Sequence, residues 1–137
     1  MIKTVRSYFT VPVMMLLIAT ATLLYTGYRA QLNQENQTAR SAGFEVLKAL
    51  NELQTIVDAH RYTPNEAPSF LNGWTQVLLI DDLADFIAPS VEKKAEALHN
   101  SWQKNLDRLQ SDRANLEITA SIKATRISLK KAIQNLH

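Results

Sequence analysis

An uncharged, mostly apolar run occupies residues 7 to 28, close to the amino terminus of the chain. At a rise of 1.5 Å per residue, a helix of this length spans roughly 30 Å, which is the thickness of the hydrocarbon core of a bilayer. Tyr25 and Tyr28 lie at its far end, where aromatic rings prefer the headgroup boundary. The pattern predicts one transmembrane helix over residues 7–28, preceded by a short cytoplasmic tail of residues 1–6.

Two other interpretations of this run stay open from the sequence. Residues 19–21, Ala-Thr-Ala, match the small-x-small pattern of a signal-peptide cleavage site after a basic start, but Leu23 and Leu24 continue the apolar run beyond it. A buried helix of a soluble core is the other interpretation, and an uncharged run of this length is unusual in such helices. We therefore favour the membrane anchor.

Basic residues flank the run unevenly. Lys3 and Arg6 precede it together with the amino terminus, whereas Arg29 and Arg40 follow it and are offset by one acid. The positive-inside rule then favours a cytoplasmic amino terminus. We expect a single-pass protein of a bacterial inner membrane, with residues 29–137 in the periplasm.

The pattern changes to helical periodicity after the run. Apolar and small side chains recur at spacings of four and three, which predicts a long helix over about residues 30–62. Phe44, Leu47 and Ile56 widen its apolar stripe beyond a two-stranded seam, so the helix should pack against more than one neighbour. The positions of the stripe are Leu32, Asn36, Ala39, Gly43, Val46, Leu50, Leu53, Val57 and His60.

Prolines divide the rest of the chain. Pro64 and Pro68 remove backbone donors and push the preceding residues away from helical angles, so the first helix should end there. Ser69 is suited to cap the next helix. A second boundary falls at Pro89, and Ser90 could cap the helix after it. These boundaries predict a helix over residues 70–88 and helical structure after them.

Ser111 and Asp112 interrupt the apolar stripe of the last segment. One long helix with a phase shift, or a short strand over residues 118–124, would also fit this pattern, but we favour two helices over residues 90–110 and 112–136. The predicted fold is all-α: an amino-terminal transmembrane helix that continues into an antiparallel three- or four-helix bundle ectodomain.

Residues 70–88 do not fit a simple bundle helix. Their apolar face changes sides midway, and Asp81 then falls on the side of Trp74, where a buried carboxylate is costly unless it is paired. Either the helix breaks near Asp81 and each half buries its own face, or another protein covers the segment, although ordinary core packing is the plainer explanation. The candidate partner-binding residues are Phe70, Trp74, Leu78, Leu79, Asp81, Asp85 and Phe86.

Basic residues gather at the end of the chain. Of the 15 Lys and Arg residues, all but Lys3 and Arg6 belong to residues 29–137, where they balance 13 acids, and this neutrality argues against nucleic acid. After residue 117 the basic side chains have no acidic neighbours. The candidates for contact with anionic lipid or with an acidic partner face are Lys123, Arg126, Lys130 and Lys131, although a solvated helix face is the simpler explanation.

Sites for chemistry are poorly represented. The chain has no cysteine, its three histidines lie on different segments, and its three glycines form no phosphate loop. Asp81 and Asp85 have a spacing that could hold a divalent ion, but capping explains them more simply. We expect no catalytic residue, no metal and no cofactor.

The function that we expect is that of a non-enzymatic accessory or assembly protein whose periplasmic domain binds another envelope protein through residues 70–88. One alternative is a ligand-sensing bundle that signals through a partner, because the arrangement of anchor and helical domain resembles the start of bacterial chemoreceptor sensory domains. Another is a coiled-coil envelope tether. The sequence leaves homo-oligomerisation open.

Overall fold

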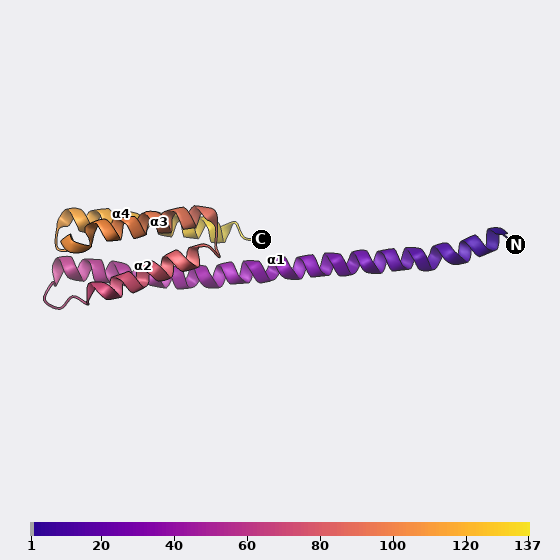
Figure 1. The fold of residues 1–137 in the computed structure, drawn as a ribbon, viewed down its shortest axis with the longest axis horizontal. Helices are drawn as coiled ribbons and strands as arrows, with labels where there is room; N and C mark the ends of the chain where they lie inside the picture. Colours follow the sequence, from indigo (N-terminus) through magenta and orange to yellow (C-terminus); the bar gives the residue numbers. More distant parts are fainter. Residues whose placement is uncertain (1) are drawn as a thin grey trace. The chain divides into compact units, whose positions relative to one another are not determined.

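A computed structural model describes the backbone of residues 2–137 and the side chains of residues 10–137. In this part of the chain the regular structure is helical, without a strand. Figure 1 shows the order of the elements along the chain. They are α1 (Ile2–Tyr62), α2 (Phe70–Ala84), α3 (Pro89–Asn105), the short 3-10 helix η1 (Leu106–Arg108) and α4 (Asp112–Gln134).

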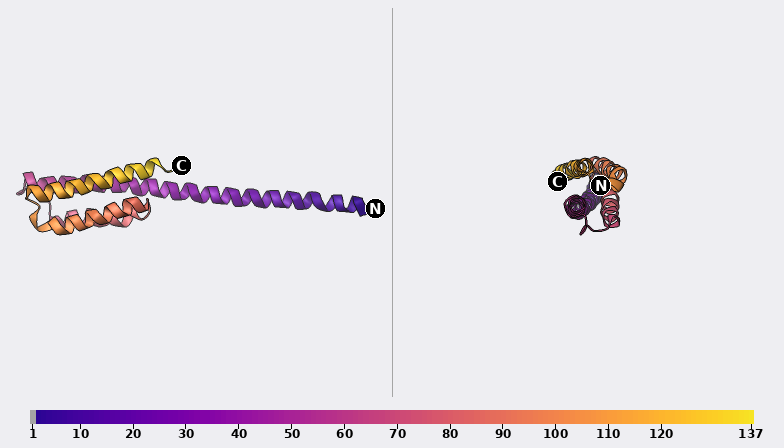
Figure 2. Two further views of the ribbon diagram at one scale, coloured as in Figure 1. Left: turned by 90° about the horizontal axis from the view of Figure 1, so that it is seen from above. Right: turned by 90° about the vertical axis from the view of Figure 1, so that its left-hand side faces the viewer.

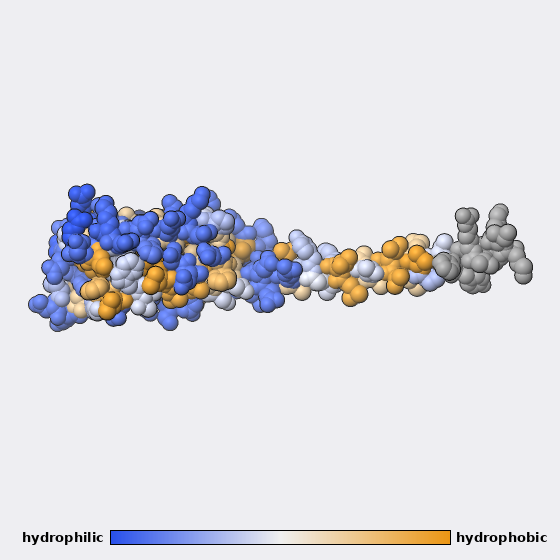
Figure 3. Space-filling model, viewed as in Figure 1, coloured by the Kyte–Doolittle hydropathy of each residue, from blue (hydrophilic) through white to orange (hydrophobic). Residues whose placement is uncertain are grey.

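The chain forms two compact units, residues 1–35 and residues 36–137. In the first unit, the side chains from Thr10 to Glu35 are exposed, and Figure 3 shows apolar patches among them. The hydroxyls of Thr20, Thr22 and Thr26 donate to carbonyls one turn earlier, so these polar groups are satisfied within the helix.

Helix α1 is the one helix of the described residues that is long and apolar enough to cross a membrane. A signal sequence or the core helix of a soluble protein passes the same test of length and composition. The side chains of Lys3 and Arg6, on which the predicted orientation depends, lie outside the described residues.

The second unit has one hydrophobic core, to which the later part of α1, α2, α3 and α4 all contribute. The views of Figures 1 and 2 agree that α2, α3 and α4 lie alongside this part of α1. Trp102 of α3 is the largest fully buried side chain, and Leu50, Leu53, Leu98 and Leu129 are buried in the same core.

Two glycines allow close packing within this unit. A Cβ atom on Gly73 of α2 would overlap the six-membered ring of Trp102, and one on Gly43 of α1 would overlap Ile133 of α4. Neither glycine has a positive φ, so the space that a missing side chain leaves, not the backbone conformation, explains the residue type. Gly43 therefore permits the close approach of α4 to α1.

Helices α1 and α4 are joined by polar side chains beside the core. The Gln54 amide donates to Thr119 Oγ1 at 3.0 Å, and the Asn115 amide donates to Asp58 Oδ1 at 3.1 Å. Arg61 and Asp112 form an ion pair, which raises the pKa of Arg61 and lowers that of Asp112. Hydrogen bonds with fixed partners set the register of α4 along α1.

Several helix boundaries differ from the predicted ones. Helix α2 runs unbroken through Asp81, which excludes a break there as the explanation of this segment, and it ends at Ala84 instead of residue 88. Helix α3 ends at Asn105 instead of residue 110. Ser90 does not cap α3, because Pro89 is already its first residue, without a side-chain cap. Prolines are favoured at this first position, since its N–H has no partner within the helix.

The predicted cap at Ser69 and the predicted turn after α3 are present, and Ser111 caps α4. Ser69 Oγ accepts from the Leu71 amide, and Ser111 Oγ accepts from the Ala114 amide. The favoured prediction of two helices after residue 90 is confirmed, because η1 and a turn separate α3 from α4. This turn also interrupts the long rod over residues 90–136 that a coiled-coil tether would require.

The contact between Gly73 and Trp102 should be sensitive to a single methyl group. We expect Gly73→Ala to destabilise the second unit by about 1–3 kcal/mol, because an overpacked core must shift its side chains. Thermal unfolding of the full-length protein in mild detergent, followed by circular dichroism, measures this loss. Gly27→Ala is the control, since nothing lies within 4 Å of that position, and an equal loss in both variants would contradict the packing argument.

Candidate functional site: the outer face of α2

The two sides of α2 have different neighbours. Gly73, Val77, Ile80 and Ala84 are buried in the core. The opposite side carries exposed apolar residues with two carboxylates among them, and Figure 3 shows apolar patches over α2. We define the α2 outer face as Phe70, Leu71, Leu78, Leu79, Asp82, Asp85 and Phe86.

The apolar residues of the α2 outer face are too exposed to belong to the core. The exposed fractions of Leu71, Leu78 and Phe86 are 61%, 47% and 59%. Scattered exposed leucines need no explanation, but several along one helix face, with acidic residues among them, are typical of a protein interaction surface. The arrangement therefore favours docking of another apolar surface.

Trp74 and Asp81, two of the predicted partner-binding residues, turn toward α3 instead. The Trp74 ring lies edge-on to Trp102 at 6.5 Å and to His99 at 5.4 Å between centroids. Asp81 Oδ2 lies 3.1 Å from His99 Nδ1. The pairing with His99 removes the expected cost of a carboxylate beside aromatic rings, so no break in the helix is needed.

The other predicted residues of this segment lie on the α2 outer face: Phe70, Leu78, Leu79, Asp85 and Phe86. Sequence reasoning missed Leu71 and Asp82, which share this face. The signal was available, because Leu71, Leu78 and Asp85 recur at intervals of seven along a straight helix.

The predicted basic residues of α4 fall into two groups. Lys123, Lys130 and Lys131 are exposed, and among the described side chains none forms an ion pair or hydrogen bond with them. Arg126 is partly buried and donates to Asn51 Oδ1 of α1 at 2.7 Å. Arg126 therefore ties α4 to α1, whereas the three lysines are available to a ligand or partner.

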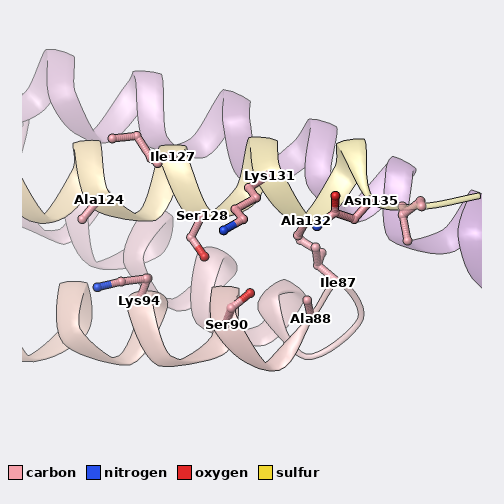
Figure 4. Close-up of a pocket in the computed structure, with 11 residues that line it drawn as sticks. Ile87, Ala88, Ser90, Lys94, Ala124, Ile127, Ser128, Lys131, Ala132 and Asn135 are labelled. Atoms are coloured by element: carbon pink, nitrogen blue, oxygen red, sulfur yellow. The ribbon is translucent and has the colours of Figure 1, made fainter.

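An open groove of about 600 Å³ lies between the start of α3 and the end of α4. Lys94 and Ser90 border it from α3, and Lys131 and Ser128 border it from α4 (Figure 4). Its apolar lining comes from Ile87, Ala88, Ala124, Ile127, Ala132 and Leu136. The α3–α4 groove therefore combines an apolar lining with two ammonium groups, which suits a ligand that is both apolar and acidic.

A polar cluster at the turn between α3 and α4 has little capacity left for a ligand. Glu117 accepts from the Asn105 amide at 3.0 Å and from Arg113 Nε at 3.2 Å. Both hydrogen bonds hold the pKa of the Glu117 carboxyl below its usual range, and the bond from Asn105 has the larger effect. The cluster stabilises the turn between α3 and α4.

A second hollow, of about 460 Å³, lies between His60, Phe70 and the 106–111 turn. The Nε2 atom of His60 is buried without a hydrogen-bond partner among the described residues. Nowhere among the described residues is a group of three or more His, Asp or Glu side chains placed to hold a metal ion. The paired Asp81 and His99 have no third ligand, so this arrangement gives metal chemistry no support.

No protein-family model, no curated protein and no solved structure matches the chain.

The depressed pKa of Glu117 should make part of the stability sensitive to acid. A carboxyl whose pKa is lowered by folding contributes stability above its unfolded pKa, and this contribution is lost as the pH falls through the folded value. We expect Glu117→Gln to lower the melting temperature at pH 7 and to flatten its decrease below about pH 4.5.

The comparison needs melting curves of the full-length protein in detergent between pH 7 and pH 3. Some acid sensitivity should persist in Glu117→Gln, because Asp112 also has a lowered pKa. Glu52→Gln, at an exposed position of α1, is the matched control. Parallel pH profiles for the wild type and Glu117→Gln would contradict the role of Glu117.

Proposed function

We propose that the chain is a non-enzymatic, membrane-anchored binding module that docks another protein of the bacterial envelope through the α2 outer face. The observation that carries this proposal is the exposure of Leu71 and Leu78 on a helix whose other side is packed in the core, with Phe86 exposed just after its end. Covering such a face stabilises the complex by about 25 cal/mol for each Å² of apolar surface that is removed from water. Another protein is the simplest partner that could bury this face.

The anchor in this proposal is the apolar run of α1, inserted in the inner membrane with residues 1–6 in the cytoplasm. Its exposed apolar surface and its internally bonded threonines suit a lipid environment, where no water satisfies polar groups. The periplasmic part is an antiparallel helical bundle formed by the later part of α1 with α2, α3 and α4. Their shared core supports this arrangement.

The position of the anchor can be tested with single cysteines, because the native chain has none. We expect Asn65→Cys, in the exposed loop after α1, to react with a membrane-impermeant maleimide in spheroplasts, and Thr4→Cys to react only after lysis. The intact mass of the purified protein should include residues 1–28. A mass that lacks residues 1–21 would establish a cleaved signal sequence, and the reverse labelling pattern would show the opposite orientation.

The docking surface can be tested by replacing two of its exposed leucines with aspartate. We expect Leu71→Asp with Leu78→Asp to reduce the co-purified partner by on the order of tenfold or more, because hot-spot losses reach about 2 kcal/mol. Affinity purification in mild detergent with quantitative mass spectrometry measures the loss. Circular dichroism should show an unchanged fold, since both side chains are exposed.

Leu116→Asp is the matched control, because Leu116 is 67% exposed on α4, away from the α2 outer face. The proteins that co-purify with the Leu116→Asp variant should remain at wild-type abundance. If the variant with both leucines replaced retains every partner, the α2 outer face is not the docking surface.

A further inference from the structure

Two surfaces of the second unit are complementary in charge. The carboxyl-terminal end of the α2 outer face carries Asp82 and Asp85 beside Phe86, and residues 62–92 contain no basic side chain. The α3–α4 groove is bordered by Lys94 and Lys131, and residues 118–136 contain no acidic side chain. One surface is apolar with carboxylates, and the other is apolar with ammonium groups.

The charges on both surfaces are free to pair with a partner. Among the described side chains, none forms a hydrogen bond or ion pair with the carboxylates of Asp82 and Asp85 or with the ammonium groups of Lys94 and Lys131. Opposite charges that meet when such surfaces close fix their register and suppress wrong partners.

The groove also offers space for an aromatic side chain. Its volume of about 600 Å³ is within the range of pockets that enclose small ligands. Ile127, 59% exposed, contributes to its apolar lining, so an inserted ring would cover apolar surface that is now in water. Phe86 is the exposed aromatic residue nearest in sequence to Asp82 and Asp85, and it is suited to this role.

The two surfaces lie at the same level along the helices. Ile87, the residue after Phe86, lines the groove at its end, and the pair of Asp81 with His99 sets α2 and α3 side by side in opposite directions. Residues 82–86, at and just after the end of α2, are therefore level with Lys94 of α3. Two copies whose second units lie parallel would place the α2 end of one copy level with the groove of the other.

We propose that the α3–α4 groove binds the end of α2 from a second copy of this chain, with Phe86 in the groove and Asp82 and Asp85 paired with Lys131 and Lys94. This inference rests on the proposed function, since it requires a membrane anchor and a docking role for the α2 outer face. It assigns the α2 end to self-association and leaves Leu71 and Leu78 to the envelope partner.

The contact is heterologous, because each copy uses two different surfaces. Such contacts generate closed rings or open rows, depending on the rotation between neighbours. Each copy in the membrane would therefore contact two neighbours. This geometry distinguishes the contact from a symmetric dimer, in which the same residues meet.

Crosslinking between cysteines tests the contact on the full-length protein in its membrane. Two differently tagged copies, Asp82→Cys and Lys131→Cys, are expressed together and treated with a short bismaleimide. We expect a mixed dimer that carries both tags, and no dimer when either variant is expressed alone. Glu52→Cys in place of Asp82→Cys is the control, because Glu52 lies on the exposed side of α1.

A charge exchange tests the pairing itself. Asp85→Lys in the Asp82→Cys copy should reduce the mixed dimer by on the order of tenfold, and Lys94→Asp in the other copy should restore it. Loss without restoration would overturn the assigned pairing. These positions are exposed, so circular dichroism should show unchanged folding.

Two outcomes would overturn the inference and leave the proposed function standing. One is the absence of mixed dimers while Leu71→Asp with Leu78→Asp still removes an envelope partner. The other is a strong dimer from Asp82→Cys alone, which would show a symmetric contact. Loss of both the mixed dimer and the effect of the leucine variant would instead overturn the proposed function as well.

Discussion

The close approach of α2 to α3 at Gly73 is the packing constraint on which the rest of the second unit depends. The Trp102 ring occupies the space that a side chain at Gly73 would fill, and the ring is completely buried. An indole of this size supplies much of the apolar area in a small core, and the edge-on contact with Trp74 adds to it. Because this contact sets which side of α2 faces inward, it also determines which side is left exposed.

The functional proposals follow from that orientation. With Gly73, Val77, Ile80 and Ala84 turned inward, apolar side chains on the other side of α2 stay exposed. These are Phe70, Leu71, Leu78 and Leu79. An exposed apolar face on an otherwise polar surface favours association, and its carboxylates limit association to basic partners. The α3–α4 groove provides a basic, apolar surface of that kind within the same chain, and this is the basis for proposing a second copy as its occupant.

Much of the backbone could be predicted because its signals are local. The end of α1 before Pro64, the cap at Ser69 and the turn at Ser111 each depend on a missing N–H or on a side chain that bonds the next turn. Ser90 shows the limit of such reasoning, because Ser and Pro compete for the same helix start. The proline, which needs no hydrogen-bond partner there, occupies it.

The sequence by itself determined that the chain is helical, where its helices are interrupted, and that its first helix is apolar enough to span a membrane. Only the tertiary structure decided that Trp74 and Asp81 face His99 and that Leu71 and Asp82 share the exposed side. It alone brought Lys94 and Lys131 to one groove. The reason is physical: proline, caps and uncharged runs act within a few residues, whereas the direction of a side chain depends on neighbours that are distant in the chain.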